Sequence, residues 1–112
     1  MKLNVKERFI LRRVFAPETT TLLESDLWDD IMDKVKITAK EANDIGMVQD
    51  GLNLAWDETK EKPLDLDLTD EQIKMLRKVV RKKDDAGAIP YNPDDKTAVE
   101  LAKKILNGTK DK

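Results

Sequence analysis

The sequence contains neither cysteine nor histidine, and its only serine is Ser25. Without cysteine the chain cannot form disulfides, thiolate nucleophiles or zinc knuckles, and without histidine it lacks a general base that titrates near neutral pH. Because no histidine can activate Ser25, a Ser-His-Asp triad is excluded as well. We therefore expect a protein that is not an enzyme and that binds no cofactor or metal.

Long apolar segments are also missing. No run approaches the roughly 20 apolar residues that cross a bilayer. A charged segment directly follows residues 1–5, where a secretory signal would need an apolar core of about 7 to 15 residues. The sequence predicts a soluble protein of the cytoplasm that has no membrane partner.

Apolar and charged residues are equally abundant. Of the 112 residues, 39% are hydrophobic and 39% are charged, and 21 basic residues nearly offset 23 acidic ones, giving a net charge of −2. Disordered chains combine low hydrophobicity with a high net charge, so this composition is typical of a folded protein. The length predicts a single domain over residues 1–108 and a frayed tail at 109–112.

Three helices are predicted in the N-terminal half. Each follows a capping box, in which an Asn or Thr stands three residues before a Glu: Asn4–Glu7, Thr21–Glu24 and Thr38–Glu41. Apolar residues at helical spacing then predict helices over 5–15, 21–35 and 39–45. The predicted buried stripe of the second helix consists of Leu23, Leu27, Ile31 and Val35, joined by Trp28 and Met32.

Beyond Gly46 the apolar spacing changes from helical to alternating. Leucines alternate with other residues over 52–56 and again over 64–68, so we expect two strands there. An open polar loop at 57–63 would join them into an antiparallel hairpin. Trp56 is in phase with the leucines, which favours a half-buried position over a role as a binding anchor.

Two more helices are predicted after the hairpin. The segment 69–72 is a further capping box, and the helix that it begins ends at 85–87. Asn92 and Pro93 suit the cap and the first position of a final helix, which ends at 107–108. The predicted fold is therefore α+β and mostly helical: three N-terminal helices, a two-stranded antiparallel hairpin and two C-terminal helices. This order is that of a winged helix, although many unrelated α+β folds share it.

The second predicted helix carries an acidic face. Between residues 18 and 33 there are six acidic residues and no basic one, and four of them are spaced i, i+3, i+4 and i+7: Asp26, Asp29, Asp30 and Asp33. Such a face could dock on a basic partner, bind a divalent cation or mimic a nucleic-acid backbone, but the spacing of a calcium loop is missing. The alternative is a solvated outer face opposite the apolar stripe.

The fourth predicted helix has the opposite bias. No acidic residue interrupts residues 74–83, which include Lys74, Arg77, Lys78, Arg81 and Lys82. This basic face could hold the phosphates of a nucleic acid. Alternatively it complements the helix dipole, or pairs with the acidic helix of the same or a second molecule.

Several of these segments together resemble a family of small uncharacterised proteins of tailed phages and prophages. The resemblance is carried by the opening segment 1–8 (Met-Lys-Leu-Asn-Val-Lys-Glu-Arg), the capped segment 38–41, Trp56-Asp57, and the acidic-apolar segment 64–68. It covers most of the chain, which departs from it by having Ala-Pro-Glu-Thr at 16–19 in place of a turn that contains glycine. The family has no established activity or site residues, so the resemblance implies only a phage or prophage origin.

These observations predict a non-enzymatic interaction protein. Its partner would be a protein of the host or the phage, or further copies of the chain, and the setting would be virion assembly or modulation of a host protein. The expected location is the cytoplasm of the host cell or the virion. The alternative is a nucleic-acid-associated accessory or regulatory protein that uses the basic helix and the hairpin.

Overall fold

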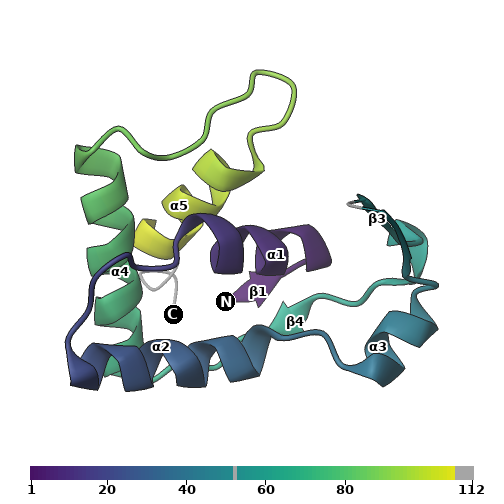
Figure 1. Cartoon of the computed structure of the whole chain (residues 1–112), viewed down its shortest axis with the longest axis horizontal. Helices are drawn as coiled ribbons and strands as arrows, with labels where there is room; N and C mark the ends of the chain where they lie inside the picture. Colours follow the sequence, from purple (N-terminus) through teal and green to yellow (C-terminus); the bar gives the residue numbers. More distant parts are fainter. Residues whose placement is uncertain (52, 108–112) are drawn as a thin grey trace.

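The structure is a computed structural model that describes residues 1–51 and 53–107. Its α-helices are α1 (Val5–Val14), α2 (Leu22–Val35), α3 (Ala39–Asp44), α4 (Asp70–Asp85) and α5 (Thr97–Asn107), and a short 3-10 helix, η1, covers Glu58–Lys60. Its strands are β1 (Lys2–Leu3), β2 (Val48–Asp50), β3 (Asn53–Ala55) and β4 (Leu64–Asp65). Figure 1 shows this mostly helical α+β fold, and the predicted class is confirmed.

The predicted caps position the first four helices. The side chains of Asn4, Thr21, Thr38 and Thr69 each accept a hydrogen bond from the backbone N–H three residues on. These bonds satisfy donors that a helix start would otherwise leave unpaired. After α3 the chain reverses at Gly46, whose φ of 66° lies in the left-handed region that glycine adopts without strain. The predicted helices over 5–15, 21–35 and 39–45 are therefore confirmed to within a residue.

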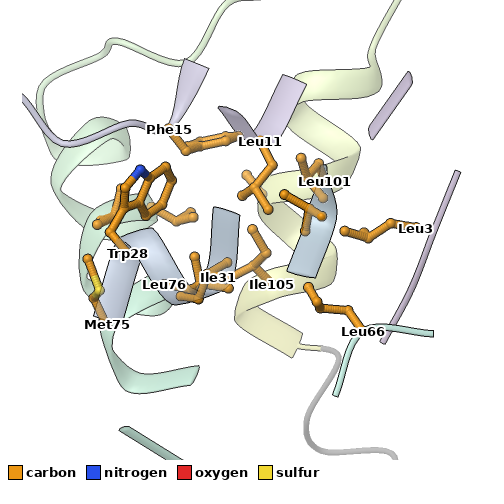
Figure 2. Packing of buried hydrophobic residues seen from close by; sticks show 14 residues of the cluster. Leu3, Leu11, Phe15, Trp28, Ile31, Leu66, Met75, Leu76, Leu101 and Ile105 are labelled. Atoms are coloured by element: carbon orange, nitrogen blue, oxygen red, sulfur yellow. The ribbon is translucent and has the colours of Figure 1, made fainter. Parts of the chain in front are cut away.

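The core lies among α1, α2, α4 and α5. α1 packs on α5, and α4 packs on both α2 and α5. Figure 2 shows side chains from all four helices and from the strand segments meeting in one cluster. The cluster consists of Leu3, Leu11, Phe15, Trp28, Ile31, Val35, Leu66, Met75, Leu76, Val79, Val80, Leu101, Ala102 and Ile105. Because α2 and α4 each bury one face here, their opposite faces are left to solvent.

The strand pairing differs from the prediction. β2 and β3 form a tight antiparallel hairpin around Gly51, whose φ is 62°, and β4 pairs with β1 at the N-terminus. The predicted pairing of 52–56 with 64–68 is therefore wrong, although position 52 itself lies outside the described residues. The reason is that a glycine turn closes β3 onto the preceding segment. Leu64 instead pairs with Leu3 of β1, whose side chain is buried in the core.

The start of α5 also differs from the prediction. Asn92 caps a turn: its Oδ1 accepts a hydrogen bond from Asp94 N at 2.9 Å, and its carbonyl accepts one from Asp95 N at 3.0 Å. Helix α5 begins five residues later, at Thr97, because the turn around Pro93 reverses the chain before the helix starts. The predicted end at 107–108 and the frayed tail at 109–112 lie mostly outside the described residues.

The order of elements matches a winged helix, but the packing does not. Helix α3 has no buried residue, and β2 is exposed along its length. In Figure 1, α3 and the β2–β3 hairpin lie at the end of the molecule away from α4 and α5. Within the described part of the chain, no helix is long and apolar enough to cross a membrane.

Candidate functional site

The acidic face of α2 points to solvent. Thr21 caps the helix, and the buried residues Trp28, Ile31 and Val35 lie on the opposite side, which faces the core. Four aspartates lie on the exposed side: Asp26, Asp29, Asp30 and Asp33. The structure thus places these predicted residues on one accessible surface.

Two of these carboxylates have partners within the chain. Asp30 accepts a hydrogen bond from the side-chain amide of Gln72 in α4, and its Oδ2 lies 3.5 Å from Lys34 Nζ. Asp33 Oδ1 lies 4.0 Å from Lys36 Nζ. Asp26 and Asp29 have no ion pair or side-chain hydrogen bond within residues 1–51 and 53–107. Over the same residues no group of three acidic side chains could hold a metal ion.

Two leucines extend the exposed face of α2 toward its N-terminus. The side chains of Leu22 and Leu23 are 89% and 67% exposed, so the prediction that Leu23 belongs to the buried stripe is wrong. The core-facing position of this first turn is taken by Glu24, whose Oε2 lies 2.9 Å from Lys78 Nζ of α4. Sequence spacing alone could not detect that α4 presents a lysine at this point.

The basic face of α4 is only partly free. Lys74, Lys78, Arg81 and Lys82 are exposed, whereas Arg77 is half-buried, and its Nε has no hydrogen-bond partner among the described residues. The hydrogen bond from Lys78 is the main cause that lowers the pKa of Glu24 below its ordinary value. Lys78 therefore belongs to the contact between α2 and α4, which is the intramolecular pairing that the sequence left open. In the described residues Lys74, Arg77, Arg81 and Lys82 have no acidic partner within 4.0 Å.

A pocket of about 530 Å³ lies beside these two faces, and the sequence did not indicate it. It lies between the loop that precedes α2, the first turn of α2, and α4 from Met75 onward with the residues that directly follow it. Its lining residues are Pro17, Glu18, Thr19, Thr20, Thr21, Glu24, Met75, Lys78, Val79, Lys82, Lys83, Ala86 and Ala88. Pockets that bind small molecules commonly have volumes of about 300 to 1,000 Å³.

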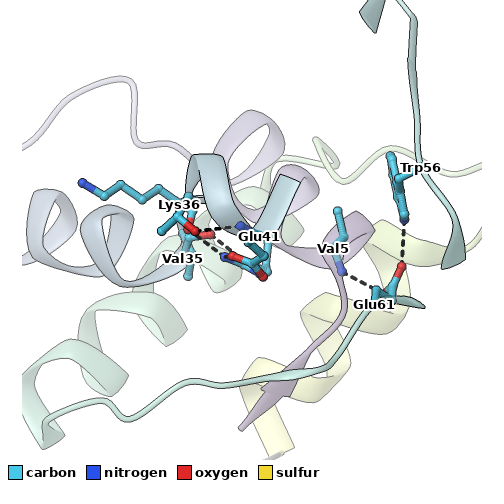
Figure 3. Close-up of polar contacts among 8 residues, drawn as sticks. Val5, Val35, Lys36, Glu41, Trp56 and Glu61 are labelled. Carbon is cyan, nitrogen blue, oxygen red and sulfur yellow. Dashed lines mark hydrogen bonds and ion pairs between the residues drawn. The ribbon is translucent and has the colours of Figure 1, made fainter. Parts of the chain in front are cut away.

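Arg8 is a buried residue that the sequence interpretation missed. Its Nε donates to the carbonyl oxygen of Val35 at 2.8 Å and its Nη2 donates to that of Lys36 at 2.7 Å, while both Nη atoms contact the carboxylate of Glu41 (Figure 3). This hydrogen bonding is the main cause that lowers the pKa of Glu41. Arg8 lies at helical spacing from Val5 and Leu11. A charged residue within an apolar stripe was the signal in the sequence that could have indicated its burial.

Trp56 is half-buried, as its spacing predicts. Its Nε1 donates to Glu61 Oε2 at 2.7 Å, and Glu61 Oε1 accepts from Val5 N at 3.2 Å (Figure 3). The ring also packs against Phe9, with the centroids 5.9 Å apart. These contacts link the segment after β3 to the start of α1, so Trp56 has a structural role.

The chain has no significant similarity to a protein-family model, to a curated protein or to a solved structure.

Proposed function

We propose that this chain is a non-enzymatic interaction protein whose α2 outer face docks on another protein or on a second copy. The α2 outer face is defined here as Leu22, Leu23, Asp26, Asp29 and Asp33. The observation that carries the proposal is the combination of two largely exposed leucines with three exposed carboxylates on one helix. The resemblance to small phage and prophage proteins supports virion assembly or modulation of a host protein as the setting.

The two kinds of side chain contribute differently to docking. Exposed apolar side chains gain free energy when a partner covers them, by about 1.5–3 kcal/mol for each fully buried leucine. Carboxylates steer association and select a partner of opposite charge. A protein surface that combines an apolar depression with basic residues at its rim is therefore the partner that fits the α2 outer face.

The absence of histidine and cysteine supports a role without catalysis. Carboxylate pairs remain as candidates for hydrolysis, but of Asp94 and Asp95 the Asp95 carboxylate is held by Thr97 and Lys6 at the start of α5. Asp65 lies 3.6 Å from the terminal amine of Met1. These contacts give one carboxylate of each candidate pair a structural role.

Site-specific cross-linking tests the docking role. A photo-reactive amino acid at position 29 should capture a discrete protein partner, or the chain itself, in the cells that produce the protein. The same amino acid at position 84 is the matched control, because Asp84 is an exposed acidic residue on a different helix. Equal capture from both positions, or none from position 29, would contradict the proposal.

A second candidate function is association with nucleic acid through α4. It is favoured by Lys74, Arg77, Arg81 and Lys82, which have no acidic partner among the described residues and could contact phosphates. Binding to duplex and single-stranded DNA should then weaken steeply as salt rises, and replacing Lys74, Arg77 and Arg81 by alanine should abolish it. No binding at low salt would exclude this function.

A further inference from the structure

The pocket beside α2 has an apolar floor and a charged rim. Met75 and Val79 form the floor and are 4% and 9% exposed, and Pro17 and Ala88 contribute apolar walls. The volume of about 530 Å³ exceeds what two leucine side chains occupy. An apolar group with a suitable shape could therefore enter from solvent.

The start of α2 presents such a group directly beside the pocket. Leu22 and Leu23 are 89% and 67% exposed, and Asp26 follows one helical turn later on the same exposed side. We name Leu22, Leu23 and Asp26 the leucine knob. It combines two apolar side chains with one negative charge.

The leucine knob cannot enter the pocket of its own molecule. Thr21 and Glu24, which flank the two leucines, line the wall of that pocket. The cap at Thr21 and the ion pair between Glu24 and Lys78 fix the helix in this register. Leu22 and Leu23 could turn inward only if the first turn of α2 unwound, so the occupant must come from another molecule.

The charges at the pocket rim complement the leucine knob. Lys78 and Lys83 are paired with Glu24 and Glu18, at 2.9 and 3.7 Å. Lys82 is exposed and has no acidic partner within the described residues, which leaves the rim with one unpaired positive charge. Asp26 of the leucine knob likewise has no basic partner in that part of the chain.

From this complementarity we propose that two copies of the chain form a symmetric dimer, in which the leucine knob of each copy occupies the pocket of the other. A two-fold axis requires both halves of the contact on one surface patch, and here they adjoin. Asp26 of one copy then faces Lys82 of the other, twice in the dimer. This inference rests on the proposed docking role of the α2 outer face and names its partner.

Sedimentation velocity over a concentration series tests the dimer. The full chain should change from monomer to dimer as concentration rises, and Leu22→Ser with Leu23→Ser should weaken association at least about tenfold, because four apolar side chains lose their burial. Asp26→Lys and Lys82→Asp should each weaken it by at least about fivefold, because each change removes both exposed ion pairs of the symmetric dimer. The two charge changes together should restore association, since the pair is re-formed in reverse.

Lys74→Asp is the matched control, because it makes the same charge change on α4 outside the pocket. It should leave association unchanged. Circular dichroism should verify that each variant is folded. If the leucine variant is unfolded, the single and double charge reversals at Asp26 and Lys82 decide the outcome.

A chain that stays monomeric at every concentration would overturn the proposed dimer. A dimer that the leucine substitutions do not weaken would also overturn it, as would a failure of the double charge reversal to restore association. A monomer that still cross-links from position 29 to a different protein overturns only this inference and leaves the docking role in place.

Discussion

Arg8 joins three elements through one side chain. It starts from α1, donates to the carbonyls of Val35 and Lys36 at the end of α2, and contacts Glu41 in α3. The last carbonyls of a helix have no partner within that helix, so a guanidinium that donates to two of them satisfies a need created by the fold. Because the Arg8 side chain is only 2% exposed, its guanidinium group is shielded from water.

Replacement of Arg8 should therefore destabilise the protein strongly. We predict that Arg8→Met lowers the free energy of unfolding by about 3–5 kcal/mol, because it leaves the Glu41 carboxylate and two carbonyls without their donor. Arg8→Lys should also destabilise, since one ammonium cannot reproduce the planar set of donors. Urea unfolding measures both changes.

The control for Arg8 is Arg12→Met on the same helix, where Arg12 is exposed. It should change stability by no more than about 0.5 kcal/mol. A loss of stability as large as that of Arg8→Met would show that the burial of Arg8 is not the cause.

Asp95 provides a pH-dependent contact between α1 and the start of α5. Its Oδ2 lies 2.6 Å from Lys6 Nζ, and its Oδ1 accepts from Thr97 Oγ1 at 2.6 Å. The hydrogen bond from Lys6, followed by that from Thr97, lowers the pKa of Asp95 from 3.8 to about 2. Because the pKa is depressed in the folded state, the stabilisation is complete above pH 3.8 and is lost as pH falls through about 2.

We predict that Asp95→Asn lowers Tm near neutral pH and that the difference from the parent protein shrinks as pH falls toward 2. Thermal unfolding followed by circular dichroism over a pH series measures this. Asp94→Asn is the neighbouring control, and it should produce no such pH-dependent difference. A difference for Asp95→Asn that stayed constant with pH would contradict the assignment.

At the scale of elements, the two small sheets have different roles. β1 and β4 bring Leu3 and, just after β4, Leu66 into the core, where they are 0% and 3% exposed. The described residues of β2 and β3 add no member to the core cluster, and Val48 is 60% exposed. The sheet formed by distant segments is therefore the one that supports the core.

A matched pair of substitutions tests this difference. Leu3→Ala should lower the free energy of unfolding by about 2–5 kcal/mol, as for other large-to-small changes in a core. Val48→Ala should change it by no more than about 0.5 kcal/mol, because the side chain is largely exposed. Chemical denaturation measures both free energies. Similar losses of stability for the two variants would contradict the assignment of Leu3, and not Val48, to the core.

For the whole molecule, the shared core has a consequence for unfolding. α1, α2, α4 and α5 all contribute to one cluster, so no helix pair can lose its packing without exposing side chains of another. We predict a single cooperative transition for residues 1–108, in agreement with the single domain that the length indicates.

The two tryptophans allow a test of cooperativity. Trp28 belongs to the core cluster and Trp56 does not, so Trp56→Phe leaves a fluorescent reporter of the core. In this variant the fluorescence and far-ultraviolet circular dichroism transitions should coincide in urea. Separate transitions would show that the helices unfold as two units.

Part of the candidate site could be predicted from the sequence. Helical spacing placed Asp26, Asp29, Asp30 and Asp33 on one face because that register depends only on the helix period. It could not supply the partners that Asp30 and Lys78 find on the neighbouring helix, nor the exposure of Leu23. The pocket arises from a loop and two helices that are distant in the sequence, so no local pattern encodes it.

The sequence by itself determined the first four helix starts, the turn at Gly46 and the exclusion of imidazole and thiol chemistry, because caps, glycine conformations and residue types are local properties. Only the tertiary structure decided that 64–65 pairs with the N-terminus, that Arg8 is buried, and that the leucine knob adjoins a pocket. Each of these depends on contacts between residues far apart in the chain, whose free energies are set by the packing of the complete core.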